Sequence, residues 1–354
     1  MQIESYMKEA FIHEASDIYI VAGTPATIRV KGSMKFLNDE KLTPDMTKQA
    51  VTSVYKMANR SMEKVELGDD DFSLSIVGVG RFRVNVFRQR SSYALVIRTI
   101  TDAIPNPEAI GIPPTVINLA NLKRGIVLFT GTTGSGKSTS LACLIDKINK
   151  EQDCHVITIE DPIEYRHTHA KSIVSQREID SDTESFIVSL RAALRQMPDV
   201  ILLGEMRDFE TISAAITAAE TGHLVLSTLH TGGAASTINR IIDVFPQNQQ
   251  NQVRSQLALT LQAVVSQQLI PSTTGGRVPA LEIMIVNPAI RNLIRENKIF
   301  QIENILQTST AEGMMTMDMS LHKLYTSGKI SKDNALLYSV DQKALMSRIL
   351  GARV

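Results

Sequence analysis

The alternation of hydrophobic and polar residues divides the chain into two differently patterned parts. In the first part, alternating segments flank one helical pattern. The alternating segments are residues 17–23, 27–37, 71–78, 80–90 and 93–100, and the helical periodicity covers residues 44–65. A period of two is typical of half-buried strands, and apolar residues every three or four positions are typical of helices. The pattern predicts a compact α+β module over residues 1–100.

The second part contains nearly continuous apolar runs separated by helical or loop segments. The runs are residues 125–130, 155–160, 200–205 and 223–229. Such runs alternating with helices predict an α/β domain with a mostly parallel sheet covered on both faces. A further strand, expected to be antiparallel, follows a Thr-Gly-Gly turn at residues 277–286.

Prolines and helical periodicity set the remaining boundaries. Four prolines fall between residues 101 and 118, a composition that resists both helix and sheet and is typical of a linker. We therefore predict the α/β domain over residues 119–288. The pattern from residue 289 to residue 354 is helical and predicts a C-terminal extension.

Composition and charge narrow the functional classes. Lys+Arg and Asp+Glu both number 37, so the net charge is zero, and Trp is absent. This balance gives no overall attraction to nucleic acid and few platforms for base stacking, so we expect no direct nucleic-acid partner. The two cysteines form no CxxC pair, and no signal peptide or uncharged run of membrane-spanning length is found. We expect a cytoplasmic location that is at most peripheral to the membrane.

The strongest chemical signal is the segment GTTGSGKS, Gly131 to Ser138, which fits G-x-x-x-x-G-K-[ST] at every fixed position. It lies between a predicted strand and a predicted helix, the context that a phosphate-binding loop requires. Its backbone N–H groups and the start of the helix can hold phosphate oxygens. Lys137 supplies a positive charge for the β- and γ-phosphates, and Ser138 is placed for Mg²⁺. We expect ATP to be bound by Gly131, Thr132, Thr133, Gly134, Ser135, Gly136, Lys137, Ser138 and Thr139.

Acidic residues at strand ends are the candidates for activating water, because ligands of such sheets sit at the carboxyl ends of the strands. Glu205 ends one apolar strand and is the predicted catalytic base. Gly204 stands before it, where a generic Walker B strand carries aspartate, so another group must help to hold the water shell of magnesium. Glu160, Asp161 and Glu164 follow another strand. They either serve that role or form a solvated acidic turn.

Two histidines flank the strand at residues 224–229. At about 3.3 Å per residue their backbones lie roughly 20 Å apart, so they cannot share a metal ion. His230 follows the carboxyl end and is placed to sense the γ-phosphate. His223 precedes the strand, where it is either reached from a neighbouring subunit or holds the preceding turn.

Arginines gather in the first module. Alternation places Arg81 and Arg83 on one face of their strand, and Arg98 joins them if the next strand pairs with it. These residues either form a solvated surface or act as arginine fingers on a nucleotide held by another domain or subunit. Fingers of this kind contribute roughly 10³ to 10⁵ in rate.

Four motifs together resemble the secretion and pilus motor ATPases, and within them the retraction motors of type IV pili. GTTGSGKST resembles the Walker A motif of that family, ITIEDPIEY its Asp box, PDVILLGEMRD its Walker B motif and TGHLVLSTLHT its His box. The segment AIRNLIRE, residues 289–296, is similar to one associated with retraction motors. The resemblance implies that Glu205 is the catalytic glutamate and Glu164 the functional acid of the Asp box. It also implies that His223 and His230 both belong to the active-site neighbourhood.

The same resemblance implies a PAS-like N-terminal α+β domain, a RecA-like P-loop domain and a hexameric homo-oligomer that uses ATP and Mg²⁺. The expected function is a ring motor at the cytoplasmic face of the inner membrane. There it drives a pilus platform protein so that pilins leave the fibre. An accessory or extension ATPase of the same superfamily, and a nucleotide-gated switch with slow turnover, remain as alternatives.

Overall fold

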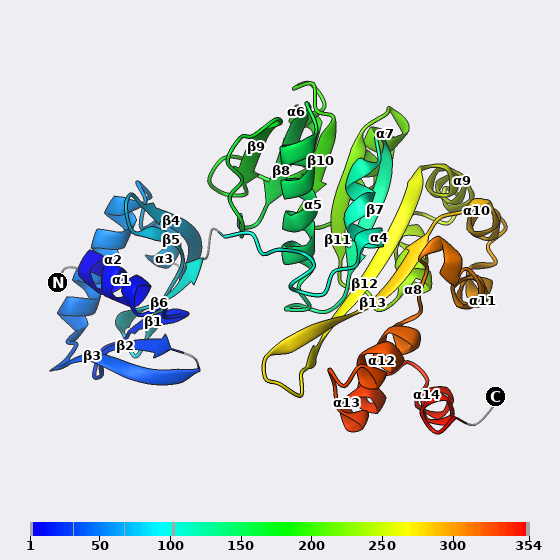
Figure 1. Ribbon diagram of the computed structural model, residues 1–354. Helices are drawn as coiled ribbons and strands as arrows, with labels where there is room; N and C mark the ends of the chain where they lie inside the picture. Colours follow the sequence, from blue (N-terminus) through cyan, green and yellow to red (C-terminus); the bar gives the residue numbers. More distant parts are fainter. Residues whose placement is uncertain (1–2, 31, 67, 101–102, 352–354) are drawn as a thin grey trace. The chain divides into compact units, whose positions relative to one another are not determined.

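A computed structural model describes residues 3–30, 32–66, 68–100 and 103–351. The chain divides into two compact units (Figure 1). Unit 1 comprises Met1–Ala103 together with Pro162–Arg166, and unit 2 comprises Ile104–Asp161 together with His167–Val354. The first two residues of the predicted linker and both extreme ends of the chain lie outside the described residues.

Unit 1 is built on an antiparallel sheet. Within the described residues the sheet has six strands in the order β3-β2-β1-β6-β5-β4. The strands are β1 (Asp17–Ile20), β2 (Pro25–Val30), β3 (Ser33–Lys41), β4 (Asp69–Ile76), β5 (Gly80–Gln89) and β6 (Ser92–Ile100). Three helices accompany it, namely α1 (Ile3–Ile12), α2 (Pro44–Met57) and α3 (Glu63–Glu66). The α+β character expected for this part of the chain is present.

Alternation along β5 builds the core of unit 1. Phe82, Val84 and Val86 are fully buried, as the period of two predicts. The prediction of one helix over residues 44–65 is wrong, because α2 ends at Met57 and the short α3 follows. Asn59 adopts a left-handed backbone conformation with φ of 51° just after α2, a geometry that ends helices.

Unit 2 is built on a mixed sheet that is mostly parallel. Its order among the described residues is β13-β12-β7-β11-β10-β8-β9. The strands are β7 (Gly125–Thr130), β8 (His155–Glu160), β9 (Ile173–Glu178), β10 (Val200–Leu203), β11 (Leu224–Leu229), β12 (Leu261–Pro271) and β13 (Arg277–Ile285). Only β13 runs antiparallel to its neighbour within this described set. The four apolar strands and the antiparallel strand expected from the sequence are present, whereas β9 and β12 were not predicted.

Helices cover both faces of this sheet. The covering helices are α4 (Pro114–Ile117), η1 (Asn118–Asn121) and α5 (Lys137–Glu151) on one face, and α6 (Phe186–Ala193), α7 (Phe209–Glu220), α8 (Ala234–Asp243), α9 (Gln250–Thr260) and α10 (Pro288–Arg295) on the other. Strand β7 serves both cores. Ile126 and Leu128 pack toward the second set of helices, and Val127 and Phe129 pack toward the first. Because β7 is buried on both faces, its sequence reads as a continuous apolar run.

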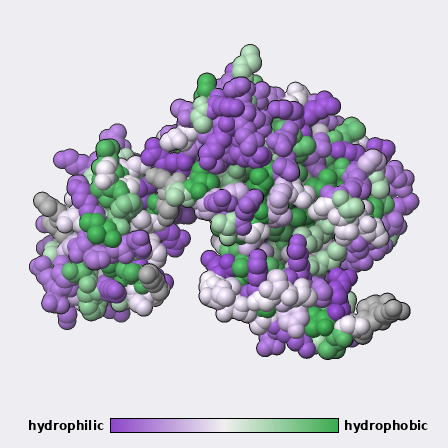
Figure 2. Space-filling model, viewed as in Figure 1, coloured by the Kyte–Doolittle hydropathy of each residue, from purple (hydrophilic) through white to green (hydrophobic). Residues whose placement is uncertain are grey.

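The rest of the C-terminal extension is helical, as predicted. It contains η2 (Ile299–Gln301), α11 (Ile302–Thr308), η3 (Thr310–Glu312), α12 (Met317–Thr326), α13 (Lys332–Leu337) and α14 (Gln342–Ile349). Helices α12 to α14 share a small core of their own with Ile270 and Ala280 at the far ends of β12 and β13. Figure 2 shows a mostly hydrophilic surface over unit 2, with hydrophobic residues near α14. In the part of the chain described, no helix is long and apolar enough to span a membrane.

Candidate functional site

The loop between β7 and α5 has the backbone geometry of an anion cradle. Gly131, Gly134 and Gly136 have φ values of 139°, 78° and 91°, a region that residues with side chains rarely adopt. A Cβ atom at Gly131 would lie 2.3 Å from the carbonyl oxygen of Gln267, so only glycine fits there. The loop therefore brings its backbone N–H groups close together at the start of α5.

Polar groups buried in this loop fit a bound phosphate. The Lys137 side chain is buried, and its Nζ donates hydrogen bonds to the carbonyl oxygens of Gly131 (2.8 Å) and Thr132 (2.9 Å). The hydroxyl of Ser135 is buried and has no hydrogen-bond partner among the described residues. A lysine ammonium, a buried hydroxyl and the positive end of α5 converge here, which is the chemistry that a phosphate requires.

Gln267 on β12 packs against the phosphate-binding loop and the start of α5. Sequence reasoning missed this residue. Its Oε1 accepts a hydrogen bond of 2.8 Å from the hydroxyl of Ser140 on α5, and both residues are buried. A Cβ at Gly136 would lie 2.7 Å from the Gln267 side-chain nitrogen. Thr130 and Ser266 add a second buried contact, with 2.7 Å between their hydroxyl oxygens. The polar residues Ser266 and Gln267 interrupt the apolar pattern of β12. This interruption is the sequence signal that could have indicated their contacts with Thr130 and Ser140.

The glycine that replaces the usual Walker B aspartate has a steric cause. A Cβ at Gly204 would lie 3.3 Å from the carbonyl oxygen of Ile159 and 3.4 Å from the Cα of Glu160. Both contacts involve the backbone of the neighbouring strand β8, which cannot move aside easily. A side chain is therefore disfavoured at this position, and Glu205 is the first acid after β10.

The carboxylate of Glu205 lies beside two basic side chains at the carboxyl ends of β10 and β11. Its Oε2 is 2.7 Å from the Nε of Arg207 and 3.8 Å from the Nε2 of His230. These three residues line a cavity of about 410 Å³ that also includes Thr133 of the phosphate-binding loop and Arg240 of α8. The structure thus brings Glu205 and His230 together with the loop, and it adds Arg207 and Arg240, which sequence reasoning missed.

The surroundings of His230 favour its neutral form. Partial burial lowers the pKa of its imidazole, and the positive charges of Lys137 and Arg207 lower it further, while Glu205 opposes them. Its 3.8 Å approach to Glu205 is an ion pair only when the imidazole is protonated. A neutral imidazole can donate or accept a hydrogen bond, which suits a residue that reads the state of a neighbouring phosphate.

His223 lies at the opposite edge of the sheet. Its Nδ1 is 2.8 Å from the carbonyl oxygen of Ala218 and 3.2 Å from the hydroxyl of Thr221, and both partners belong to the end of α7. Its own carbonyl accepts a hydrogen bond from Gly125 at the start of β7. Within one chain, His223 holds the turn between α7 and β11 and is not brought together with His230.

The acids of the predicted Asp box are dispersed. Glu160 ends β8, where its Oε1 accepts hydrogen bonds from Thr158 (2.6 Å) and Gln176 (3.1 Å). Asp161 is exposed, and the exposed Glu164 belongs to the segment that groups with unit 1. No group of three or more His, Cys, Asp or Glu arranged for a metal ion occurs in the described residues. The metal roles of Ser138, Glu160 and Asp161 stay predictions.

The arginines lie in unit 1, where β5 and β6 pair. Arg83 lies directly opposite Arg98, so these two share a face as the alternation predicts. Arg83 binds Asp71 with both Nε and Nη2, the shorter contact being 2.7 Å, and the Nε of Arg98 donates to Asp17 at 3.1 Å. Arg81 is buried. In this state Arg83 and Arg98 are engaged by carboxylates of their own unit.

Comparisons with known proteins agree with this geometry. A family described as "Type II/IV secretion system protein" matches residues 1–329. The type IV pilus retraction ATPase PilT of Pseudomonas aeruginosa is 48% identical over 91% of this chain and 93% of its own. The type IV pilus ATPase PilU of the same organism is 41% identical over 96% of this chain and 89% of its own.

A solved structure gives the same result for the fold. The crystal structure of the pilus retraction motor PilT with bound ADP matches 98% of this chain and 99% of its own, with a TM-score of 0.91 and 50% identity. The predicted α/β ATPase fold and the predicted ATPase activity are confirmed by these likenesses. On the evidence of its site, its fold and its relatives, the chain belongs to the family of type II/IV secretion system proteins.

Proposed function

We propose that this chain is an ATP-hydrolysing motor that powers the retraction of type IV pili. The observation that carries the proposal is that Thr133 of the phosphate-binding loop, Glu205 and His230 line the same cavity. A loop that fits phosphate, an acid that follows β10 and a histidine that follows β11 are suited to ATP hydrolysis. The similarity to a pilus retraction ATPase supports the choice of retraction among the uses of such a motor.

Different groups of the phosphate-binding loop have different roles in nucleotide binding. Backbone N–H groups of Gly131 to Gly136 and the ammonium of Lys137 would hold the phosphates, and Ser138 would hold Mg²⁺, which would supply positive charge for the phosphate oxygens. Glu205 accepts a proton from the attacking water or orients it, once Arg207 releases the carboxylate.

We place the motor in a larger assembly by the same reasoning. A homo-oligomeric ring, with six subunits implied by the resemblance, would act on a platform protein of the inner membrane from the cytoplasmic face. Arg81, Arg83 and Arg98 would act as fingers on a nucleotide when the units close or subunits assemble, and residues 101–118 would form the hinge. Glu164 and His223 would complete the site in that assembly. These assignments rest on the residue types and on the resemblance.

Deleting the gene tests the proposed function. A retraction motor predicts cells that keep surface pili but no longer retract them, so that twitching motility is lost. Complementation with the wild-type gene should restore motility, and complementation with a Lys137→Ala variant should not. Loss of the surface fibres themselves would contradict retraction and indicate an extension motor.

An accessory role is the second candidate, because PilU is 41% identical over nearly the whole chain. An accessory ATPase predicts that deletion weakens retraction under load but leaves retraction of unloaded pili in place. Retraction observed by fluorescently labelled pili, with and without opposing force, separates the two.

A further inference from the structure

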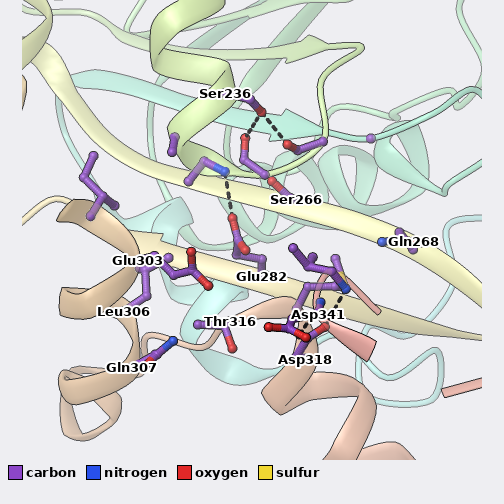
Figure 3. A pocket seen from close by; sticks show the side chains of 18 of the residues that line it. Ser236, Ser266, Gln268, Glu282, Glu303, Leu306, Gln307, Thr316, Asp318 and Asp341 are labelled. Carbon is purple, nitrogen blue, oxygen red and sulfur yellow. Dashed lines mark hydrogen bonds between the residues drawn. The ribbon is translucent and has the colours of Figure 1, made fainter. Parts of the chain in front are cut away.

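Glu282 of β13 lies between the start of α8 and the C-terminal helices (Figure 3). Its Oε1 accepts a 2.7 Å hydrogen bond from the backbone N–H of Ala234, the first residue of α8. Met317, the first residue of α12, lines the same cavity as Glu282. The half-buried Glu282 side chain thus joins β13 to the start of α8.

The first of these helices is directly connected to the candidate active site. His230 directly follows β11, and only Thr231, Gly232 and Gly233 separate it from Ala234. Gly233 has φ of 89° and no side chain to cap α8, so Glu282 supplies the cap from another element. A carboxylate at a helix N-terminus is stabilised by the helix dipole and by the N–H groups there. Glu282 therefore fixes where the segment after His230 turns into α8.

The second helix is tied firmly to β13 and to the end of the chain. On either side of Glu282, Leu281 N–H donates to the Ser320 hydroxyl at 2.9 Å, and Ile283 exchanges two backbone hydrogen bonds with Met315. The next residue of α12, Asp318, accepts hydrogen bonds from the backbone N–H groups of Val340 (2.8 Å) and Asp341 (2.9 Å) at the start of α14. A shift of α12 consequently moves α14 as well.

A cavity of about 720 Å³ lies beside Glu282, between β12, α8 and the helices α11, α12 and α14. Gly131 of the phosphate-binding loop also lines it. Beside this cavity the Glu282 carboxylate links β13 directly to α8, and the residues on either side of it link β13 to α12 and to Met315 before it.

We propose that Glu282 is a positioning residue that couples the placement of His230 to the C-terminal helices. It acts through the start of α8. The coupling runs in both directions, because any displacement of α12 that pulls on Glu282 moves the segment after His230, and the reverse also holds. The C-terminal extension is thereby connected to ATP turnover by one side chain.

Glu282→Gln is the variant that tests this coupling. Glutamine keeps the length of the side chain and an oxygen that can accept from the Ala234 N–H, but it removes the negative charge. We expect kcat for ATP hydrolysis to fall about fivefold, because the charge-assisted hydrogen bond at the start of α8 becomes a weaker neutral one. Binding of a fluorescent ADP analogue should stay within about twofold of wild type, because the phosphate-binding loop is untouched. Glu303→Gln, which changes another carboxylate of the same cavity, is the matched control and should alter neither quantity.

A double-mutant cycle separates positioning from general destabilisation. If Glu282 acts through His230, Glu282→Gln combined with His230→Ala should lower kcat no further than His230→Ala alone. Additive losses, an unchanged kcat in Glu282→Gln, or a parallel loss of ADP binding would each overturn the proposal. Should Glu282→Gln fail to fold by circular dichroism, Glu282→Asp replaces it in the same cycle with the same criteria. The inference rests on the proposed function only through ATP hydrolysis. If gene deletion shows no retraction defect, the Glu282 variants can still be judged by their ATP hydrolysis and ADP binding.

Discussion

The contacts around position 204 disfavour a side chain directly before Glu205. A Cβ at Gly204 would lie 3.3 Å from the carbonyl oxygen of Ile159 and 3.4 Å from the Cα of Glu160, so the backbone of β8 would have to shift by a small distance to accept an aspartate. The next side chain, Glu205, instead points into the cavity that Thr133 and His230 also line. Proximity to both of these residues supports the proposal that Glu205 acts on water during ATP hydrolysis.

Glu205→Gln should abolish most turnover without preventing nucleotide binding. The amide keeps the shape of the side chain but cannot take a proton, and general-base catalysis contributes roughly 10²- to 10⁴-fold to such reactions. Steady-state ATP hydrolysis is the measurement, with binding of an ADP analogue measured in parallel. Glu210→Gln on the exposed start of α7 is the control. A Glu205→Gln protein that hydrolyses ATP at the normal rate would remove this residue from catalysis.

Residues of the candidate site differ in how readily the sequence reveals them. The phosphate-binding loop is contiguous, so its spacing alone identifies it. Glu205 and His230 are predictable because both follow apolar strands of a parallel sheet, whose carboxyl ends share one edge. The roles of Gln267 and Arg207 could not be predicted. Gln267 contacts a segment that is distant in sequence. The contact of Arg207 depends on the direction that its side chain takes after β10.

At the scale of elements, four of the strands predicted in unit 2 have a nearly continuous apolar pattern. Strand β12 follows α9 directly at Leu261 without a glycine or proline between them, so no local signal separates helix from strand. Strand β9 lies at the edge of the sheet, and its sequence IVSQRE is largely polar. Its stability comes from pairing with β8, which sequence periodicity does not report.

The contact between β12 and α5 should control how tightly nucleotide is held. Gln267→Leu keeps the volume of the side chain but removes the acceptor for the Ser140 hydroxyl, leaving that buried donor unsatisfied. We expect ADP affinity to fall about tenfold, measured by titration with a fluorescent analogue. In a cycle with Ser140→Ala, the double variant should lose less affinity than the sum of the single variants. Thr274→Val, at an exposed position between β12 and β13, serves as the control. If the affinity losses of Gln267→Leu and Ser140→Ala simply add, the two residues do not act together in nucleotide binding.

At the scale of the whole molecule, the chain separates the chemistry between two units. The phosphate-binding loop, Glu205 and His230 belong to unit 2, and the three arginines belong to unit 1. Alternation along β5 and β6 predicted which arginines share a face, because strand pairing follows local rules. The sequence could not predict that Asp71 and Asp17 engage Arg83 and Arg98, since these contacts depend on the register of other strands.

The central claim is that ATP is hydrolysed only when guanidinium groups of unit 1 act on a triphosphate held by unit 2. Single-turnover hydrolysis by a variant with Arg81→Lys, Arg83→Lys and Arg98→Lys tests it most directly, because lysine keeps each charge but not the planar fork. Arg88→Lys, on the same strand β5 and stacked over Tyr93, is the matched control. The account predicts a rate lower by roughly 10³ to 10⁵ in the triple variant, with ADP binding and the control unchanged. A correctly folded triple variant that hydrolyses ATP at the wild-type rate would contradict it.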